Sequence, residues 1–207
     1  MPASNSTDPR KQRTVDALLS AAEAVFAVLP FEEVTVDEIA ERAGVAVGSI
    51  YNNFGSKSGL YAAVIERALD VDREYMDKAY TPERSPIEQL EAAAEQYFRF
   101  YLDQPEFFRM LAFPPPPGPY AAAAETAERL ARRVDEQNAR MVDAIERGIR
   151  DNTILPLDAR KAATVLWASW NGIISLAWRT DGLHQDDEAL AELLALAADV
   201  VGRGLRA

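Results

Sequence analysis

The sequence predicts an all-α protein of about nine helices. Apolar residues recur every three or four positions along most of the chain, the alternating pattern of a β-strand does not occur, and helix start signals are frequent. With 207 residues and 48% hydrophobic content, the chain can form a real core in one large or two small domains. It has no cysteine, so neither a disulfide framework nor thiol chemistry is expected.

The first helix is expected at about residues 11–29. Its apolar residues at helical spacing are Val15, Leu18, Leu19, Ala22, Val25, Phe26 and Leu29. Pro30 ends this helix because proline has no N–H group and its ring blocks the helical backbone. The polar, acidic residues 1–9 before it are expected to form a short disordered lead, not a signal peptide.

A pattern of two short helices joined by a tight turn begins at Thr35. Thr35 and Glu38 have the spacing of a capping box. Gly44 ends the first helix, because glycine adopts the left-handed conformation without steric cost. In the second helix, Ile50 and Phe54 lie four residues apart, so both can face the core. This is the pattern of a helix-turn-helix unit, whose second helix enters the DNA major groove.

The second helix of this unit carries hydrogen-bonding side chains without charge. These are Ser49, Tyr51, Asn52 and Asn53. Side chains of this kind can contact base edges or phosphates. Ser56 is expected to cap the next helix, which places Lys57 in its first turn. A cation there is unfavourable for the helix dipole, and a nearby phosphate would offset that cost.

The rest of the chain is also predicted to be helical. The further helices are expected from the Ser56 cap to about 78, at 86–103, in a short segment from 105, at about 121–151, at about 158–180, and after residues 184–187. Between them, Pro114 to Pro119 cannot be helical and is expected to be an extended loop. That loop is either a stiff connector or a proline motif for a partner domain.

The N-terminal quarter of the chain resembles the TetR (tetracycline-repressor) family of bacterial transcription regulators. The resemblance covers about 50 residues. It rests on the long first helix, the Val34–Val45 run, Ser49-Ile50-Tyr51, Phe54 and Lys57. It implies a helix-turn-helix DNA-binding domain at 10–57 and a helical ligand-binding and dimerisation domain at 58–207. It further implies a cytoplasmic repressor that releases a near-palindromic double-stranded DNA operator when it binds a small effector.

The resemblance also implies which residues contact DNA. Those that match residues on or near the family's recognition helix are Val47, Gly48, Ser49, Tyr51, Asn52 and Asn53. The residues that match Tyr51 and Lys57 hold phosphates, and a Thr or Ser near Thr35 and Val36 contacts the DNA backbone. Asn53 departs from the family pattern, because a histidine is common there, and Ser58-Gly59 replaces acidic residues.

The charge balance limits how this chain can hold DNA. It has 22 basic and 33 acidic residues, a net charge of −11, which does not suggest a general nucleic-acid binder. No charged residue lies between Gly44 and Gly55, so the commonest specific contact, arginine with guanine, is absent. Phosphate neutralisation is expected from the Arg10-Lys11-Arg13 arm, Lys57 and helix N-termini. The alternative for the arm is an ordinary charged helix start.

Aromatic residues in the second half are candidates to line a small-molecule pocket. The candidate ligand-binding residues are Phe98, Tyr101, Phe107, Met110, Phe113, Asn138, Met141, Trp167, Trp170 and Asn171. Mostly apolar walls with a few polar groups are typical of such pockets, so an apolar or aromatic ligand is expected. Ordinary core packing is the alternative for each of these residues.

The last two helices are apolar around more than one face, which favours burial against a second copy of the chain. The candidate interface residues are Val165, Ile173, Leu190, Leu194, Ala197 and Val201. The resemblance implies the same, because family members dimerise through this helix pair. The alternative is burial of both helices within one monomer.

An enzyme is not expected. The only histidine is His184, there is no cysteine, and Glu-x-x-His metal spacing is absent, so no catalytic residues, metal or cofactor are predicted. No stretch of about 20 apolar residues occurs, so no membrane span is expected. The competing hypothesis is a helical ligand-binding or adaptor protein with a weak or unused DNA module, which the acidic balance supports.

Overall fold

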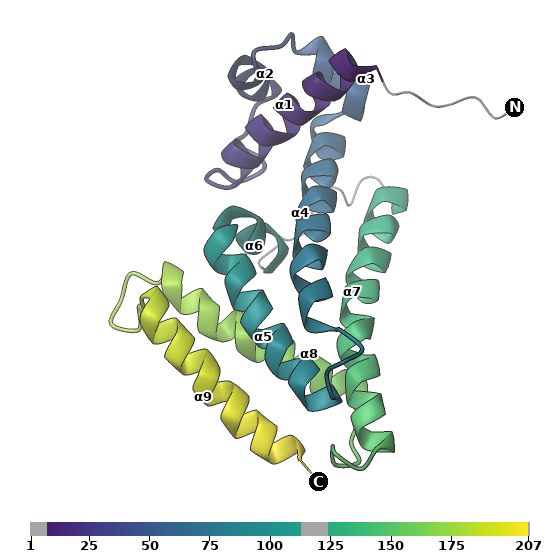
Figure 1. Ribbon diagram of the computed structural model, residues 1–207. Coiled ribbons are helices and arrows are strands. Elements are labelled where there is room, and N and C mark those ends of the chain that lie inside the picture. Colours follow the sequence, from purple (N-terminus) through teal and green to yellow (C-terminus); the bar gives the residue numbers. More distant parts are fainter. Residues whose placement is uncertain (1–7, 113–123, 207) are drawn as a thin grey trace, which may run out of the picture. The chain divides into compact units, whose positions relative to one another are not determined.

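The computed structural model describes residues 8–112 and 124–206, and within these ranges the all-α prediction is confirmed (Figure 1). The helices are α1 (Pro9–Phe26), α2 (Val36–Ala43), α3 (Gly48–Phe54), α4 (Lys57–Ala79), α5 (Pro86–Asp103), α6 (Pro105–Ala112), α7 (Ala124–Arg150), α8 (Ala159–Ile174), the 3₁₀ turn η1 (Ser175–Trp178) and α9 (Asp187–Leu205). The β-pairing in the described ranges is one isolated bridge, between Ile154 and Arg206.

The chain divides into two compact units. Unit 1 comprises Met1–Ala68 and Glu106–Ala131, and unit 2 comprises Leu69–Pro105 and Arg132–Ala207. Helices α4 and α7 each contribute to both units, so the chain passes between the units without a linker at these points. The functional boundary between residues 57 and 58 stays a prediction. Residues 1–7 of the lead, the 114–119 proline segment, Phe113 and the expected start of the seventh helix lie outside the described residues.

Helix α1 is shifted toward the N-terminus relative to the predicted 11–29. It starts earlier because Asp8 caps it, accepting a hydrogen bond from the Arg10 N–H at 2.9 Å, and because Pro9 fits the first helical position. It ends at Phe26, three residues before the predicted end. The residue before a proline is disfavoured in the helical conformation, so Pro30 ends the helix upstream of itself.

Local signals determine the helix-turn-helix in unit 1. Thr35 caps α2 by accepting from the Glu38 N–H at 3.2 Å. Gly44 ends α2 in the left-handed region, with φ of 67°, and the next N–H, of Val45, donates to the Ala40 carbonyl at 3.0 Å. Ile39 of α2 and Ile50 of α3 are fully buried, which anchors both helices to the core that α1 completes.

Gly44→Ala is expected to destabilise unit 1 by about 1 kcal/mol. Nothing lies within 4 Å of a β-carbon built at Gly44, so the cost is the left-handed backbone rather than a clash. Chemical unfolding at fixed protein concentration measures the change. Gly204→Ala is the matched control, since this glycine also has open space but lies in helical α9, where alanine is favoured. Equal effects of the two substitutions would contradict the backbone explanation.

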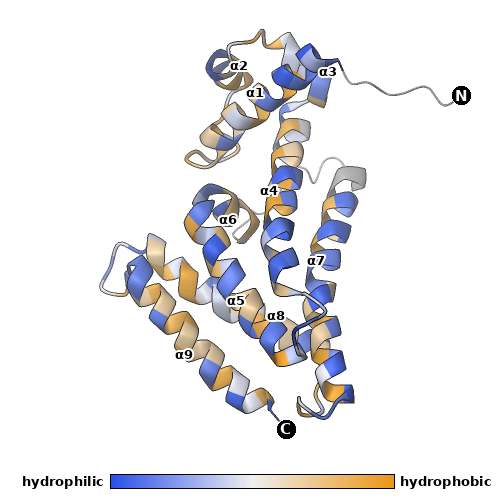
Figure 2. Ribbon diagram, viewed as in Figure 1, coloured by the Kyte–Doolittle hydropathy of each residue, from blue (hydrophilic) through white to orange (hydrophobic). Residues whose placement is uncertain are grey.

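Unit 2 contains the second part of α4, α5, most of α7, α8 and α9. A capping box starts α5: the Ser85 N–H donates to Glu88 at 2.8 Å and the Glu88 N–H donates back to Ser85 at 3.4 Å. Helix α9 packs against α5 and α8. Figure 2 shows the many apolar residues of α8 and α9.

Helix α8 ends at Ile174, short of the predicted 180. The Ser175 hydroxyl donates to the Gly172 carbonyl at 2.7 Å, three residues back, which suits the tighter 3₁₀ turn η1 that follows.

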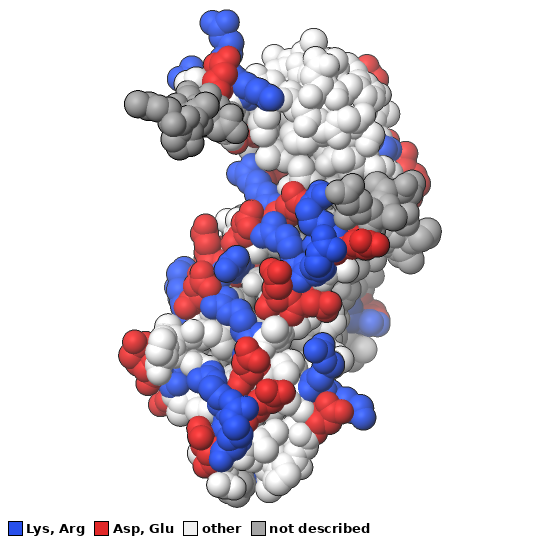
Figure 3. Space-filling view, turned by 90° about the vertical axis from the view of Figure 1, so that its right-hand side faces the viewer, with Lys and Arg blue, Asp and Glu red and all other residues white. Residues whose placement is uncertain are grey.

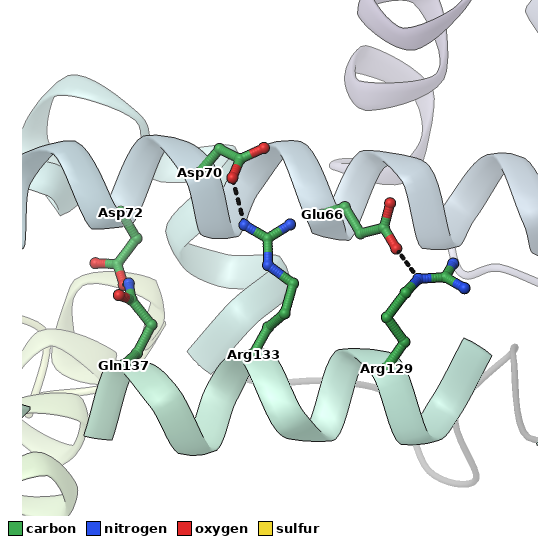
Figure 4. A network of polar contacts seen from close by, with 6 residues as sticks. All are labelled: Glu66, Asp70, Asp72, Arg129, Arg133 and Gln137. Carbon is green, nitrogen blue, oxygen red and sulfur yellow. Dashed lines mark hydrogen bonds and ion pairs between the residues drawn. The ribbon is translucent and has the colours of Figure 1, made fainter. Parts of the chain in front are cut away.

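In unit 2, α7 lies beside the second part of α4 and runs in the same direction. Arg133 pairs with Asp70, Arg140 pairs with Asp77 at 2.6 Å, and between these pairs Gln137 donates to Asp72 at 2.6 Å. Figure 4 shows part of this series along the two helices.

Candidate DNA-binding and ligand-binding sites

Helix α3 presents an uncharged polar surface. Tyr51 is 52% exposed, and Asn52 and Gly48 are also exposed. Ser49 is half-buried, and its carbonyl accepts from the Asn53 side-chain amide at 2.8 Å, so one end of Asn53 is engaged within the helix. The side chains that α3 offers most openly to a partner are therefore Tyr51 and Asn52.

The flanks of this surface add one hydroxyl and three cations. Thr35 is exposed at the start of α2, whereas Val36 and Val47 are half-buried. Arg10, Lys11 and Arg13 are exposed near the start of α1, whose first turn holds no acidic residue after the capping Asp8. These cations lie at the positive end of the helix dipole, an unfavourable place that a bound polyanion would improve.

Lys57 points back toward the loop before α2. Its ammonium group donates to the backbone carbonyls of Phe31 and Val34, each at 2.7 Å, and lies 4.3 Å from the centre of the Phe31 ring. A cation in the first turn of α4 is unfavourable for the helix dipole, and the two carbonyls offset this cost. From the sequence, a DNA phosphate is expected in this role. Two of the three ammonium donors are engaged in this way, which leaves one for another partner.

Some of the predicted ligand-binding residues come together in unit 2. The Tyr97 hydroxyl donates to the Asn171 side chain at 3.1 Å, and the rings of Tyr97 and Trp170 lie 5.9 Å apart. Tyr101 stacks with Phe98 at 5.7 Å and donates to Asp187 at 2.9 Å. Met141 is buried in the same unit.

Other members of that set lie elsewhere. Phe107 and Met110 are buried in unit 1, and Phe113 lies outside the described residues. Asn138 and Trp167 are exposed, so neither is enclosed among the helices of unit 2, and their part in a ligand site stays a prediction. Each follows a residue that faces inward, Gln137 and buried Leu166, and one step along a helix turns the side chain by about 100°.

Unit 2 also contains a buried polar cluster around Asp72, which was not predicted from the sequence. The Asp72 side chain is 8% exposed, and burial raises its pKa to about 6, although the Gln137 hydrogen bond and the Arg140 charge oppose the rise. Burial also raises the pKa of the Tyr80 and Tyr97 hydroxyls, and the Asp72 charge adds to both effects. A signal was present: Asp72 lies four residues after Ala68 and four before Met76, on the apolar face of α4.

Two atoms of this cluster lack a hydrogen-bond partner among the described residues. They are Oδ1 of Asp72 and Nη1 of Arg140, and both are buried. The second oxygen of Asp72 accepts from Gln137, and the second terminal nitrogen of Arg140 pairs with Asp77. Arg140 also lies over the Tyr80 ring, 5.2 Å from its centre.

A groove of about 380 Å³ in unit 2 shares Gln137 and Arg140 with this cluster. Its lining residues are Leu69, Arg73, Arg133, Glu136, Gln137 and Arg140. Arg73 is exposed and has no ion-pair partner in the part of the chain that the structure describes. Figure 3 shows basic and acidic side chains interspersed on the face that includes α7. The groove is thus polar, unlike the largely apolar pocket that the sequence predicts.

Two of the predicted dimer-interface residues are buried inside unit 2. Leu190 is 0% exposed and Leu194 is also buried, because α9 packs this side against α5 and α8. Their predicted place at the surface between two copies is therefore wrong. Ile173, Ala197 and Val201 are half-buried.

Val165 is exposed in the single chain, as a residue must be if it is to contact a second copy. Leu196 and Val200, which were not predicted, are 59% and 61% exposed and lie four residues apart on α9, so they share one face. Among the described residues, no helix is long and apolar enough to cross a membrane, and no group of side chains has the composition of a metal site.

Two family profiles match most of the chain. The profile described as bacterial regulatory proteins, tetR family, matches residues 18–64, and the tetracyclin repressor-like C-terminal domain matches residues 90–201. Together they cover the helix-turn-helix and most of unit 2.

Individual proteins agree with these profiles. The regulator RutR of Escherichia coli K12 is 28% identical over 171 residues, which cover 79% of this chain and 76% of RutR. The repressor KstR2 of Mycolicibacterium smegmatis is 26% identical over 149 residues, which cover 68% of this chain and 67% of KstR2. AibR, solved with isovaleryl coenzyme A and operator DNA, superposes with a TM-score of 0.72 at 17% identity and covers 88% of this chain and 97% of its own. The chain therefore belongs to the tetR family of bacterial regulatory proteins and is a DNA-binding regulator of transcription, not an enzyme.

Proposed function

We propose that the protein is a dimeric repressor that binds a near-palindromic operator through α3 and releases it when unit 2 binds a small ligand. The observation that carries this proposal is the exposed, uncharged face of α3. The Tyr51 and Asn52 side chains are exposed, whereas the preceding Ile50 is fully buried and fixes the orientation of the helix. Such a helix can read base edges through hydrogen bonds without contributing general attraction to DNA.

The few cations near α3 set how strongly salt should affect operator binding. Arg10, Lys11 and Arg13 are exposed, whereas most of the Lys57 donors are engaged with backbone carbonyls. Few counterions are then released on binding, so the dependence of affinity on salt should be shallow. Specificity would come from α3 and not from general attraction to DNA.

The dimer surface that we propose is the apolar face formed by Val165 on α8 with Leu196 and Val200 on α9. All three are more than half exposed in the monomer. Large apolar side chains grouped on one face indicate a protein–protein contact. A two-fold contact here would supply two copies of α3, which a near-palindromic operator requires.

The ligand site that we propose lies in unit 2, near the Asp72 cluster and the Tyr97–Trp170 ring pair. Helix α4 carries Asp72 and also begins at Lys57, directly after the end of α3. It is therefore the continuous element through which binding in unit 2 can bias the position of α3. AibR, which shares the fold, was solved with an acyl-coenzyme A and operator DNA, so a ligand with an apolar acyl part is a reasonable class.

Selection of binding sites from a random duplex pool tests the proposed function. The purified full-length protein should enrich a two-fold symmetric consensus at moderate salt without added ligand. A folded, dimeric protein that enriches no sequence, with or without cell metabolite extract, would favour the adaptor hypothesis. Enrichment only with extract would indicate a co-repressor and contradict ligand-induced release.

Asn52→Ala is expected to relax base preference at one position of each half-site and to weaken operator binding about 5- to 150-fold, as loss of a base contact does. Lys11→Met should instead weaken binding similarly on every sequence, because a phosphate contact carries no sequence information. Repeating the site selection with each variant measures both effects. An unchanged consensus with Asn52→Ala would exclude this residue from base reading.

Leu196→Glu is expected to convert the dimer to a monomer at micromolar concentration, because it places a charge in the apolar face proposed as the interface. Analytical ultracentrifugation measures the change. The control is Val134→Glu, which introduces the same charge at an exposed apolar residue of α7 in the same unit. A dimer that survives Leu196→Glu, or is equally disrupted by Val134→Glu, would place the interface elsewhere.

A further inference from the structure

Asp72 and Arg140 carry opposite charges that do not pair with each other: Asp72 is buried, whereas the Arg140 side chain is 27% exposed but has one buried terminal nitrogen. Both residues lie in unit 2, on α4 and α7, and the guanidinium charge acts on the carboxyl group. No hydrogen bond or ion pair joins them within the described ranges. Each uses one terminal atom elsewhere, and the remaining atoms, Oδ1 and Nη1, are both buried without a partner. Buried polar atoms in this state are rare in native proteins and call for an explanation.

We propose that this pair is a recognition site for a neutral polar group of the ligand, one that donates a hydrogen bond to Oδ1 of Asp72 and accepts one from Nη1 of Arg140. An amide or a hydroxyl group meets both requirements. This inference rests on the proposed ligand response and adds the chemistry of the ligand's polar end to it.

The charges of the pair decide which ligands fit. A carboxylate or phosphate would satisfy Arg140 but be repelled by Asp72, and an ammonium group would satisfy Asp72 but be repelled by Arg140. A hydrocarbon would leave both buried atoms without a partner, which is costly. A neutral group that both donates and accepts avoids all three penalties.

The surroundings support a ligand site more than a structural polar contact. Gln137 and Arg140 line the groove of about 380 Å³ and also contact or act on Asp72, so the groove adjoins the cluster. Gln137 donates to Oδ2 of Asp72, and Asp77 and the Tyr80 ring contact the Arg140 guanidinium, so the side chains that carry both unpaired atoms are held in place before a ligand arrives. Such preorganisation improves affinity because less order must be created on binding. The nearby aromatic pair of Tyr97 and Trp170 can accept an apolar part of the ligand.

Four probes with the same six-carbon chain test the proposal by thermal unfolding of the full-length protein. They are hexanamide, hexan-1-ol, hexanoate and hexylammonium, at equal concentration, pH and ionic strength. Hexanamide and hexanol should raise the midpoint by about 3 °C or more at roughly tenfold excess over the dissociation constant. Hexanoate and hexylammonium should raise it by less than a third as much.

Variants assign the effect to the pair. Asp72→Leu should abolish the hexanamide shift, and Arg140→Met provides the same test if Asp72→Leu does not fold. Asp70→Asn is the matched control: it removes one carboxylate from α4, but that carboxylate is exposed and pairs with Arg133, so the hexanamide shift should persist.

An equal or larger shift with hexanoate or hexylammonium would overturn the proposal, as would a hexanamide shift that survives both variants or no hexanamide shift in the unmodified protein. These measurements use no DNA, so they are separate from the site selection. A hexanamide shift without an enriched operator would count against the proposed function alone. An enriched operator without a hexanamide shift would count against this inference alone.

Discussion

Asp72→Asn is expected to stabilise the ligand-free protein at pH 7.5 by about 1–3 kcal/mol. Burial raises the pKa of this carboxyl group from 3.8 to about 6, so the folded protein at pH 7.5 holds an ionised, incompletely paired carboxylate in its interior. A rise of that size corresponds to at most about 3 kcal/mol of lost stability. Asparagine has nearly the same shape, can still accept from Gln137, and carries no charge.

The dependence on pH distinguishes this explanation from a change in packing. The raised pKa means that the folded state binds a proton more tightly than the unfolded state, so the wild type loses stability as pH rises through the window from about 4 to about 6. Above about pH 6 the loss is complete, and below about pH 4 it vanishes. The stability difference between variant and wild type should therefore be smallest at pH 4, grow to pH 6, and stay constant to pH 7.5.

The groups around Asp72 should not obscure the pH dependence of this stability difference. Burial raises the pKa of the Tyr80 and Tyr97 hydroxyls near Asp72, which moves them further above this window, and Arg140, Asp77 and Glu136 are common to both proteins. Urea unfolding at several pH values and one protein concentration measures the effect. Asp70→Asn, at an exposed ion pair, should change stability by less than about 0.5 kcal/mol. A less stable Asp72→Asn protein at pH 7.5 would show that the carboxylate stabilises the fold.

The second large effect is expected at Lys57. Lys57→Met keeps the aliphatic stem beside the Phe31 ring but removes the donor from the Phe31 and Val34 carbonyls. Leaving part-buried carbonyls without this partner should destabilise unit 1 by about 1–3 kcal/mol. Operator affinity should fall on all sequences alike, because the loop before α2 and the start of α4 lose their connection, and the salt dependence should not change.

Lys11→Met is the comparison for this prediction. Lys11 is exposed in the first turns of α1, so its loss should leave stability unchanged and reduce the slope of log affinity against log salt by about one. Unfolding and fluorescence anisotropy over a range of salt concentrations measure both quantities. If Lys57→Met kept its stability and reduced the salt slope instead, Lys57 would be a phosphate contact, as the family resemblance implies, and not an anchor of the loop.

Several features could be predicted from residues close together in the chain. Thr35 and Gly44 mark the ends of α2, and Ser85 with Glu88 starts α5, because a capping contact joins groups only a few residues apart. The all-α class followed from the spacing of apolar residues, and family membership followed from the order of motifs around α3. The exposed face of α3 could be predicted in the same way. The four-residue spacing of Ile50 and Phe54 marks the side that faces the core, and Tyr51 and Asn52 lie on the opposite side.

The sequence alone thus determined where most helices begin and end, which helix carries the DNA-reading surface, and that the family is one of regulators. Only the tertiary structure decided which apolar face is covered by the protein's own helices: Leu190 and Leu194 are buried, whereas Leu196 and Val200 are exposed. It also showed that Lys57 binds carbonyls more than 20 residues away and that Asp72 lies inside. Helical periodicity states which side chains share a face but not what packs against that face, and both burial and charge pairing depend on the packing partner.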